Sequence, residues 1–281
     1  MTLKRILHFP TIKIIIGSLV VAGSVALGEW LSKSLLDEIR IPGDFKNLIT
    51  ATIDAFIALF SYILLFRSYE RRTITELSLF WKNAVIGFLA GFILQSLLIL
   101  VIYMFDGYSI KSVNPVSFLL PAFTTALTAG FVAELIIRGV IFRLTEESLG
   151  TTITLIIFTL LFAVLHASSK GATSLSVLST AMQAGFLLSA AFVFSRSLWF
   201  PIFLHFAWDF TEPGIYGAIN PGNTINRSLF TSEIVGSRLL TGEELGPENS
   251  IQATLFCLTA GLLFLSLAKR KNNFIKPYWK K

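Results

Sequence analysis

The segment from Phe131 to Arg143 sets two charged side chains, Glu134 and Arg138, within a run that is otherwise apolar up to its final Arg143. A charged side chain near the middle of a membrane helix costs about 2.5–3.5 kcal/mol on insertion scales, so it usually faces a bundle interior or a water-filled cavity. The four-residue spacing places both charged groups on one helical face. This stretch is therefore the first candidate for a functional site.

Two histidines lie in other apolar segments. His166 ends the pattern Phe162-Ala-Val-Leu-His166, and His205 begins the pattern His205-Phe-Ala-Trp-Asp209, so each motif places two side chains one helical turn apart. A carboxylate and an imidazole are the usual pair for activating water, and a second imidazole can donate to an oxyanion. A purely structural alternative is a buried ion pair with interhelical hydrogen bonds from the histidines. The presence of three such residue pairs in one chain favours a functional site over this structural alternative, because intramembrane ionisable groups are seldom without function.

The composition places these groups in membrane helices. The chain has 281 residues, of which 54% are hydrophobic and 14% charged, which is typical of a polytopic membrane protein. A span needs about 20 apolar residues. The sequence therefore predicts an all-α bundle of about eight transmembrane helices around a polar cavity. The predicted spans are 11–30, 47–66, 83–104, 117–142, 152–167, 174–194, 197–212 and 251–268.

We expect a single integral membrane domain, 1–281, because the polar intervals between spans are short. Its parts are the N-terminal spans (1–116), a core with the three motifs (117–212), an outward loop (213–250), and the last span with a basic tail (251–281). Most of the 23 Lys and Arg residues fall on one side of this topology, which predicts cytoplasmic termini in a bacterial plasma membrane. We expect the tail to lie along the anionic inner leaflet.

Several residue classes limit the partners and the chemistry. The net charge of +6 comes from basic residues at loop ends and in the tail, so we expect no nucleic acid partner. The single cysteine, Cys257, excludes an intramolecular disulfide and a Cys-rich metal site.

Gly87 and Gly91 form a small-xxx-small pattern that lets helix backbones approach, and Gln95, one turn later, can bond across helices. His8 precedes the first span and is expected to be solvated.

The three motifs together resemble those of the CPBP intramembrane proteases, which include the type II CAAX prenyl endopeptidases and the Abi-type proteins. The family motifs read Glu-Glu-x-x-x-Arg, Phe-x-x-x-His and His-x-x-x-Asn/Asp. The resemblance covers about residues 117–212. It implies an eight-helix bundle around a hydrophilic cavity, and an endopeptidase that hydrolyses a peptide bond of a membrane-associated or lipidated peptide.

The resemblance also implies roles for the motif residues. Glu134 would pair with His166 to activate water, His205 and Asp209 would form the oxyanion side, and Arg138 would bind substrate or support the structure. An ionised Asp209 cannot donate, so it must be protonated or must orient His205. The cofactor stays open between zinc, with Glu134, His166 and His205 as candidate ligands, and a metal-free mechanism. The expected partners are a peptide or membrane-protein substrate and the lipid bilayer, and no motif indicates an oligomeric state.

The chain departs from the family at Ala133, where the family has its first glutamate, generally assigned as the water-activating base. Glu134 lies about 100° round an α-helix from that position. Glu134 could take over the base role after a small helix rotation, although an ion pair with Arg138 would weaken it as a base. A second interpretation is a non-enzymatic binding, immunity or scaffold protein that keeps the cavity. A third is an engineered inactive variant. A proton-relay transporter is the weakest alternative, because the chain has no inverted repeat.

Overall fold

The computed structural model describes residues 9–78, 80–169, 171–218, 227–242 and 245–280. His8, predicted to be solvated, lies outside this part. All eight predicted apolar stretches form helices. In chain order these are α2 (Pro10–Asp37), α3 (Gly43–Tyr69), α4 (Phe80–Met104), a composite helix from α5 (Leu120–Thr128) to α6 (Arg143–Leu149), α7 (Thr151–Ala167), a composite helix from α8 (Ser174–Thr180) to α9 (Leu188–Ser195), α10 (Trp199–Phe210) and α12 (Ile251–Arg270).

The helices have the length and surface of membrane helices. Six of them reach at least 18 residues and are apolar enough to cross a bilayer, while α7 and α10 are shorter apolar helices. Large hydrophobic side chains such as Leu19, Phe56, Leu89 and Val164 are exposed on the outside of the bundle, as a lipid-facing surface requires. The predicted all-α polytopic membrane fold is confirmed.

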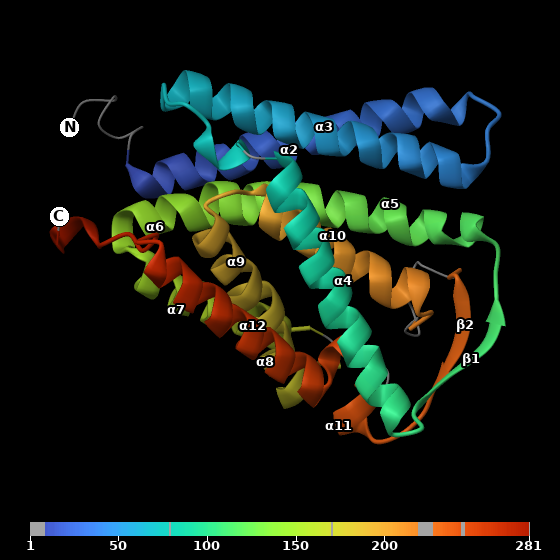
Figure 1. Ribbon diagram of the computed structural model, residues 1–281. Helices are drawn as coiled ribbons and strands as arrows, with labels where there is room; N and C mark the ends of the chain where they lie inside the picture. The colour runs from blue at the N-terminus through green and yellow to red at the C-terminus, as the bar shows by residue number, and fades with distance from the viewer. Residues whose placement is uncertain (1–8, 79, 170, 219–226, 243–244, 281) are drawn as a thin grey trace.

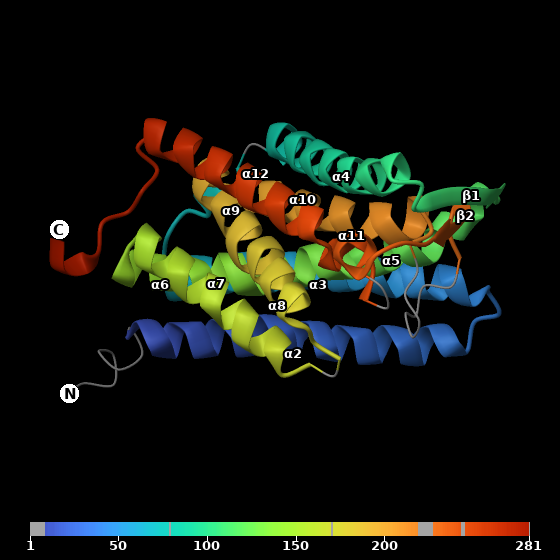
Figure 2. The same ribbon diagram turned by 90° about the horizontal axis from the view of Figure 1, so that it is seen from below.

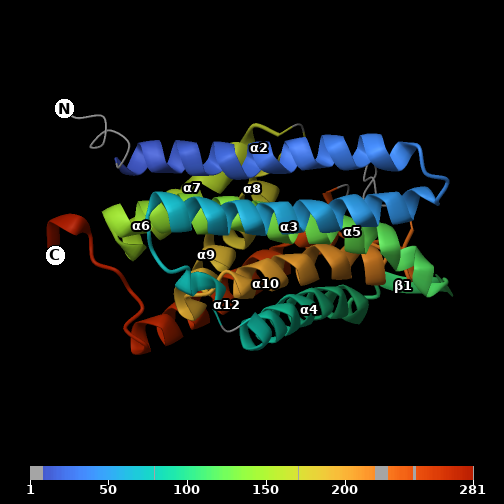
Figure 3. The same cartoon turned by 90° about the horizontal axis from the view of Figure 1, so that it is seen from above.

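Helix α10 lies between α4 and the composite helix that carries the first motif (Figures 1 and 3). Glycines allow both contacts. A Cβ atom at Gly87 or Gly91 of α4 would collide with the carbonyl oxygens of Phe200 or Leu204, and one at Gly130 would lie 2.8 Å from the carbonyl oxygen of Ile202. The small-xxx-small pattern of α4 therefore allows close packing against α10. Gly130 allows the motif helix to approach α10 from its own side, and this contact brings the first and third motifs together.

The helices that surround the motifs contain π-helical turns. They are η3 (Ala129–Ala133) and η4 (Leu135–Phe142) between α5 and α6, η5 (Ala181–Leu187) between α8 and α9, and η6 (Thr211–Ile215) after α10. A π-helical turn bonds residue i to i+5 and rotates successive side chains by less than an α-helix does. The regular α-helical geometry assumed from the sequence around Ala133 and Glu134 is therefore wrong. Such turns are rare and occur often at functional sites.

The connection 213–250 contains regular structure that the sequence did not indicate. Strand β2 (Phe230–Ile234) pairs antiparallel with β1 (Tyr108–Val113), which follows α4, and Tyr108 lies opposite Ile234. The short helix α11 (Arg238–Thr241) and the 3-10 turn η8 (Pro247–Asn249) then lead to α12. Residues 219–226 and 243–244 of this predicted loop lie outside the described chain. The sheet attaches the connection to the opposite end of the bundle from α6 (Figure 1).

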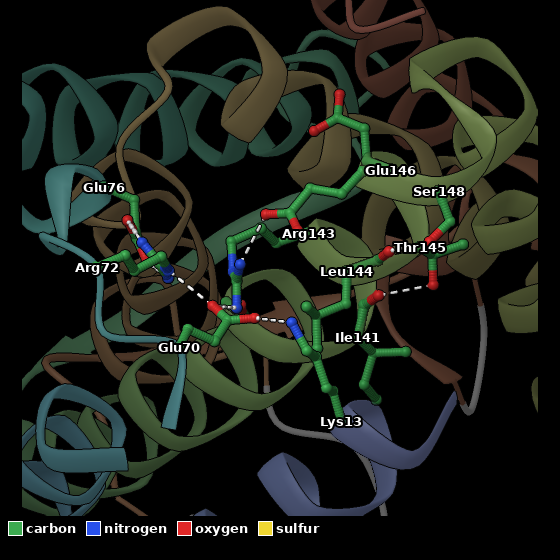
Figure 4. A network of polar contacts seen from close by, with 12 residues as sticks. Lys13, Glu70, Arg72, Glu76, Ile141, Arg143, Leu144, Thr145, Glu146 and Ser148 are labelled. Carbon is green, nitrogen blue, oxygen red and sulfur yellow. Dashed lines mark hydrogen bonds and ion pairs between the residues drawn. The ribbon is translucent and has the colours of Figure 1, made fainter. Parts of the chain in front are cut away.

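A network of charged residues joins α2, the connection after α3 and α6 at one end of the bundle (Figure 4). Glu70, just after α3, accepts hydrogen bonds from Lys13 Nζ of α2 at 3.0 Å and from Arg72 Nε at 2.7 Å. Arg143 Nη2 of α6 lies 3.0 Å from the same carboxylate. Burial favours the neutral acid, but Arg143, Arg72 and Lys13 together hold the pKa of Glu70 below its ordinary value. This network fixes the α2–α3 pair against the end of the motif helix.

The tail after α12 packs on the turn between α6 and α7 (Figure 2). The backbone N–H of Thr151 donates to the carbonyl of Ile275 at 3.0 Å, and the N–H of Ile275 donates to Thr151 Oγ1 at 2.8 Å. Asn273 Nδ2 donates to the carbonyl of Phe194 at the end of α9, at 2.8 Å. This part of the tail is thus anchored to the bundle, and contact with the inner leaflet stays a prediction.

Candidate active site

Glu134, Arg138 and His205 form a buried cluster where the motif helix meets α10. Glu134 is 0% exposed, and its Oε1 accepts a hydrogen bond from Arg138 Nη1 at 2.8 Å and lies at hydrogen-bond distance, 2.8 Å, from His205 Nδ1. Arg138 also donates through Nη2 to the carbonyl of Ala184 in η5. The Arg138 guanidinium can only donate, so Glu134 Oε1 is the acceptor of that bond, and Nδ1 of His205 can donate to the same oxygen when it carries a proton.

A cavity of about 280 Å³ lies beside this cluster and is lined by α7, the α8–α9 helix, α10 and the turn before α12. It contains both membrane-embedded histidines and two carboxylates, whereas Glu134 and Arg138 do not line it. The lining residues are His166, Thr180, Gln183, Ala184, Leu187, Leu188, Leu204, His205, Trp208, Asp209 and Glu248. The polar side chains of the second and third motifs therefore line one cavity. Glu134 of the first motif lies outside the cavity and contacts it only through His205.

His166 is not paired with Glu134, in contrast to the expectation from the resemblance. Glu134 pairs with His205 instead, because Gly130, one turn earlier, allows α10 to approach the motif helix closely. Nε2 of His166 is buried and has no hydrogen-bond partner within the described chain. Phe162, one turn before His166, lies against Arg138, with 5.5 Å between the guanidinium carbon and the ring centroid. The second motif thus presents a free imidazole nitrogen and packs its aromatic ring on the first motif.

Asp209 lies one turn after His205 and on the same face of α10. Its Oδ2 is 3.4 Å from His205 Nε2, so the His205 ring stands between two carboxylates, Glu134 on one side and Asp209 on the other. A protonated ring in this position donates from both nitrogens. Asp209 is thus placed where it can orient the His205 ring, and the Nε2–Asp209 contact lies at the wall of the cavity described above.

Glu248 and Glu212 are site residues that the sequence analysis missed. Glu248 Oε2 accepts a hydrogen bond from Trp208 Nε1 at 3.2 Å, and its backbone N–H points at Glu212 Oε1 at 3.4 Å. Glu212 Oε2 accepts from Gln95 Nε2 at 2.9 Å, which confirms the interhelical bond expected of Gln95. Glu248 lies 40 residues after Trp208 in the chain, so no local spacing signals their contact.

The described side chains do not fit a zinc site. Among them, no three His, Cys, Asp or Glu residues are placed to hold one ion. The only Glu134 oxygen with hydrogen bonds is shared by Arg138 and His205, and both nitrogens of His205 are directed at carboxylates. A structural or catalytic zinc needs at least three ligands that converge on it.

The motif helix, the histidine of α7 and the His205–Asp209 pair of α10 belong to one continuous stretch of sequence. Residues 115–211 match the family described as Type II CAAX prenyl endopeptidase Rce1-like. The match to this endopeptidase family includes all three motifs and confirms the resemblance inferred from them, over about a third of the chain. No curated protein and no solved structure matches the chain. With six long apolar helices and this family match, the chain is an integral membrane protein.

Proposed function

We propose that the chain is an intramembrane endopeptidase of the CAAX type that hydrolyses a peptide bond of a membrane-associated or lipidated peptide. The observation that supports this best is the cavity between the helices, where the free Nε2 of His166 and the ring of His205 face the same space. An apolar bundle that merely used these residues for packing would leave no reason for an unpaired buried imidazole.

The reaction consists of water attack on a carbonyl held in the cavity. His166, in the tautomer protonated at Nδ1, accepts a hydrogen bond from the water through Nε2 and orients it. His205, protonated on both ring nitrogens, shares its Nε2–H between Asp209 Oδ2 and the carbonyl oxygen as negative charge develops there, and Asp209 orients the ring. Such donors are most effective in a site that excludes bulk water.

Glu134 and Arg138 act as positioning residues in this proposal. Glu134 fixes the orientation of His205 through the 2.8 Å contact with Nδ1, while Arg138 holds Glu134 and the η5 turn. This resembles the general arrangement in which a buried carboxylate orients a catalytic imidazole. The charge of Glu134 then stabilises the protonated state of His205 and is not needed as a base.

Peptide cleavage by the purified protein tests the function. The substrate is a fluorogenic peptide that ends in a CAAX sequence, used with and without an S-prenyl group on its cysteine, in detergent or liposomes. We expect cleavage by the natural chain and a loss of about 100- to 10,000-fold in kcat for His166→Ala. Gly23→Ala serves as the matched control, because no atom lies within 4 Å of a Cβ added there.

Ala133→Glu, which restores the family glutamate, separates the enzyme from the non-enzymatic alternative. Cleavage by Ala133→Glu alone, with peptide binding by the natural chain, would show that the chain binds without turnover. Zinc content is measured on the same samples. Less than one zinc per active protein is the expected result, because the described donors do not converge.

A further inference from the structure

Ala133 stands where the family motif has a glutamate, and no residue of the first motif lines the cavity. Glu134 does not replace it, because this residue is 0% exposed, does not line the cavity, and shares Oε1 between Arg138 and His205. Its other oxygen, Oε2, is also buried. A water molecule in the cavity has no access to either oxygen of Glu134.

Glu248 brings a carboxylate to the same cavity from a different part of the chain. It lies in η8, directly before α12, and lines the cavity together with His166, His205 and Asp209. The backbone of Glu248 is held at two points, since its N–H is directed at Glu212 and its carbonyl accepts a hydrogen bond from Gln183 of η5.

The carboxylate of Glu248 is fixed by one oxygen and open at the other. Trp208 Nε1 donates to Oε2 at 3.2 Å, and no described residue makes a hydrogen bond to Oε1. A carboxylate that is oriented by one bond and keeps a free oxygen toward a cavity is suited to accept a proton from bound water. This is the geometry that Glu134 lacks.

We propose that Glu248 is the general base of the peptidase reaction, in place of the carboxylate missing at Ala133. This rests on the proposed function. Glu248 Oε1 takes a proton from the water as the water oxygen bonds to the scissile carbonyl carbon, and the carbonyl electron pair moves to its oxygen, which His205 stabilises. When the tetrahedral intermediate collapses, the C–N bond breaks and the Glu248 carboxylic acid gives its proton to the departing amine.

The charge around Glu248 suits a base at neutral pH. Burial, followed by the negative charge of Asp209, raises the pKa of Glu248 to about 7, while the Trp208 hydrogen bond and His205 act in the opposite direction. Two further titratable groups lie near Glu248. They are Glu212 of η6 and the thiol of Cys257 in α12. Because a base must be ionised, activity is expected to rise with pH through this range.

The test compares Glu248→Gln with Glu233→Gln in the same cleavage assay over pH 5–9. Glu233 lies in β2 on the same connection, is exposed and pairs with Lys111, so its replacement should leave kcat unchanged. Glu248→Gln should lower kcat by about 100- to 10,000-fold and remove the rise of kcat/KM near neutral pH. The cavity variant Glu248→Ala should regain part of its activity when formate is added, which a merely structural role would not produce.

The outcomes separate this inference from the proposed function. Cleavage by Glu248→Gln within threefold of the natural chain at every pH overturns the role of Glu248 and leaves the peptidase standing. An inactive natural chain beside an active Ala133→Glu overturns both. If neither Glu248→Gln nor Glu248→Ala folds, Glu248→Asp decides. A lowered kcat with the pH rise retained supports the base, and an unchanged kcat contradicts it.

Discussion

At the scale of single residues, Arg138 is the clearest case of a charge whose environment is built by the fold. It is 1% exposed and donates to Glu134 and to the carbonyl of Ala184, while the ring of Phe162 covers its guanidinium. Removing one partner of a buried pair leaves an uncompensated charge, whereas replacing both is far less costly. Arg138 therefore stabilises the buried cluster beside the cavity by balancing the charge of Glu134.

Arg138→Met is expected to destabilise the protein by about 3–5 kcal/mol, because Glu134 keeps only His205 as a partner. The double variant Glu134→Gln with Arg138→Met should recover a large part of this loss. Arg67→Met, at an exposed position near the end of α3, is the matched control and should show no change. Thermal unfolding in detergent measures all three. A double variant no more stable than Arg138→Met would contradict the charge-balance argument.

At the scale of helices, the position of α10 decides which motif residues meet. Gly91 of α4 and Gly130 of η3 hold α10 from two sides, and η5 supplies the carbonyl that fixes Arg138. The π-helical turns η3, η4 and η5 surround the site and change the direction of the side chains relative to a regular α-helix. The contact between Glu134 and His205 is a product of this helix crossing.

Gly91→Ala is expected to separate α4 from α10 and to cost about 1–3 kcal/mol, because the new Cβ collides with the carbonyl oxygen of Leu204. Gly23→Ala in the lipid-facing part of α2 should be neutral or slightly stabilising, since alanine favours helices and nothing is close to it. Unfolding midpoints of both variants in the same detergent provide the comparison. Equal midpoints would show that α4 tolerates the added methyl group.

At the scale of the whole molecule, the Glu70 network and the tail contacts hold the α6 end of the bundle. Glu70 pairs with Lys13, Arg72 and Arg143. Hydrogen bonds between Thr151 and Ile275 connect the turn after α6 to the tail. Glu248 of the 213–250 connection lines the cavity, and the β1–β2 sheet of this connection lies at the opposite end of the bundle from α6 (Figure 1). Ion pairs and tail contacts therefore hold the α6 end, while the β1–β2 pairing with its Lys111–Glu233 ion pair holds the other end.

The Glu70 network predicts a pH-dependent stability. Its cationic neighbours lower the pKa of Glu70 from the ordinary 4.5, so its contribution is complete above that value and is lost as pH falls through the folded-state pKa. Glu70→Gln should lower stability by about 1–3 kcal/mol at pH 7 and progressively less below pH 4.5. Unfolding of both proteins over this pH range measures the difference. A constant difference at all pH values would exclude the ionised carboxylate as the cause.

The sequence predicted the helices and the motif family, because apolar length and motif spacing are local properties. It predicted the Glu134–Arg138 and His205–Asp209 pairs for the same reason. It could not predict that Glu134 contacts His205 rather than His166, since this depends on where α10 crosses at Gly130. The π-helical turns and the β1–β2 pairing also follow from contacts between distant segments, and Glu248 reaches the cavity only through such a connection.

The position of Glu248 in the chain has a consequence for biosynthesis. The histidines of α7 and α10 leave the ribosome well before η8 does, and the tail that packs on the α6–α7 turn follows later still. On the proposed mechanism, a nascent chain that has inserted both histidines still lacks its proton acceptor. A membrane peptidase built in this order is unable to cut neighbouring polypeptides at the site of insertion until nearly all of its own helices have been synthesised.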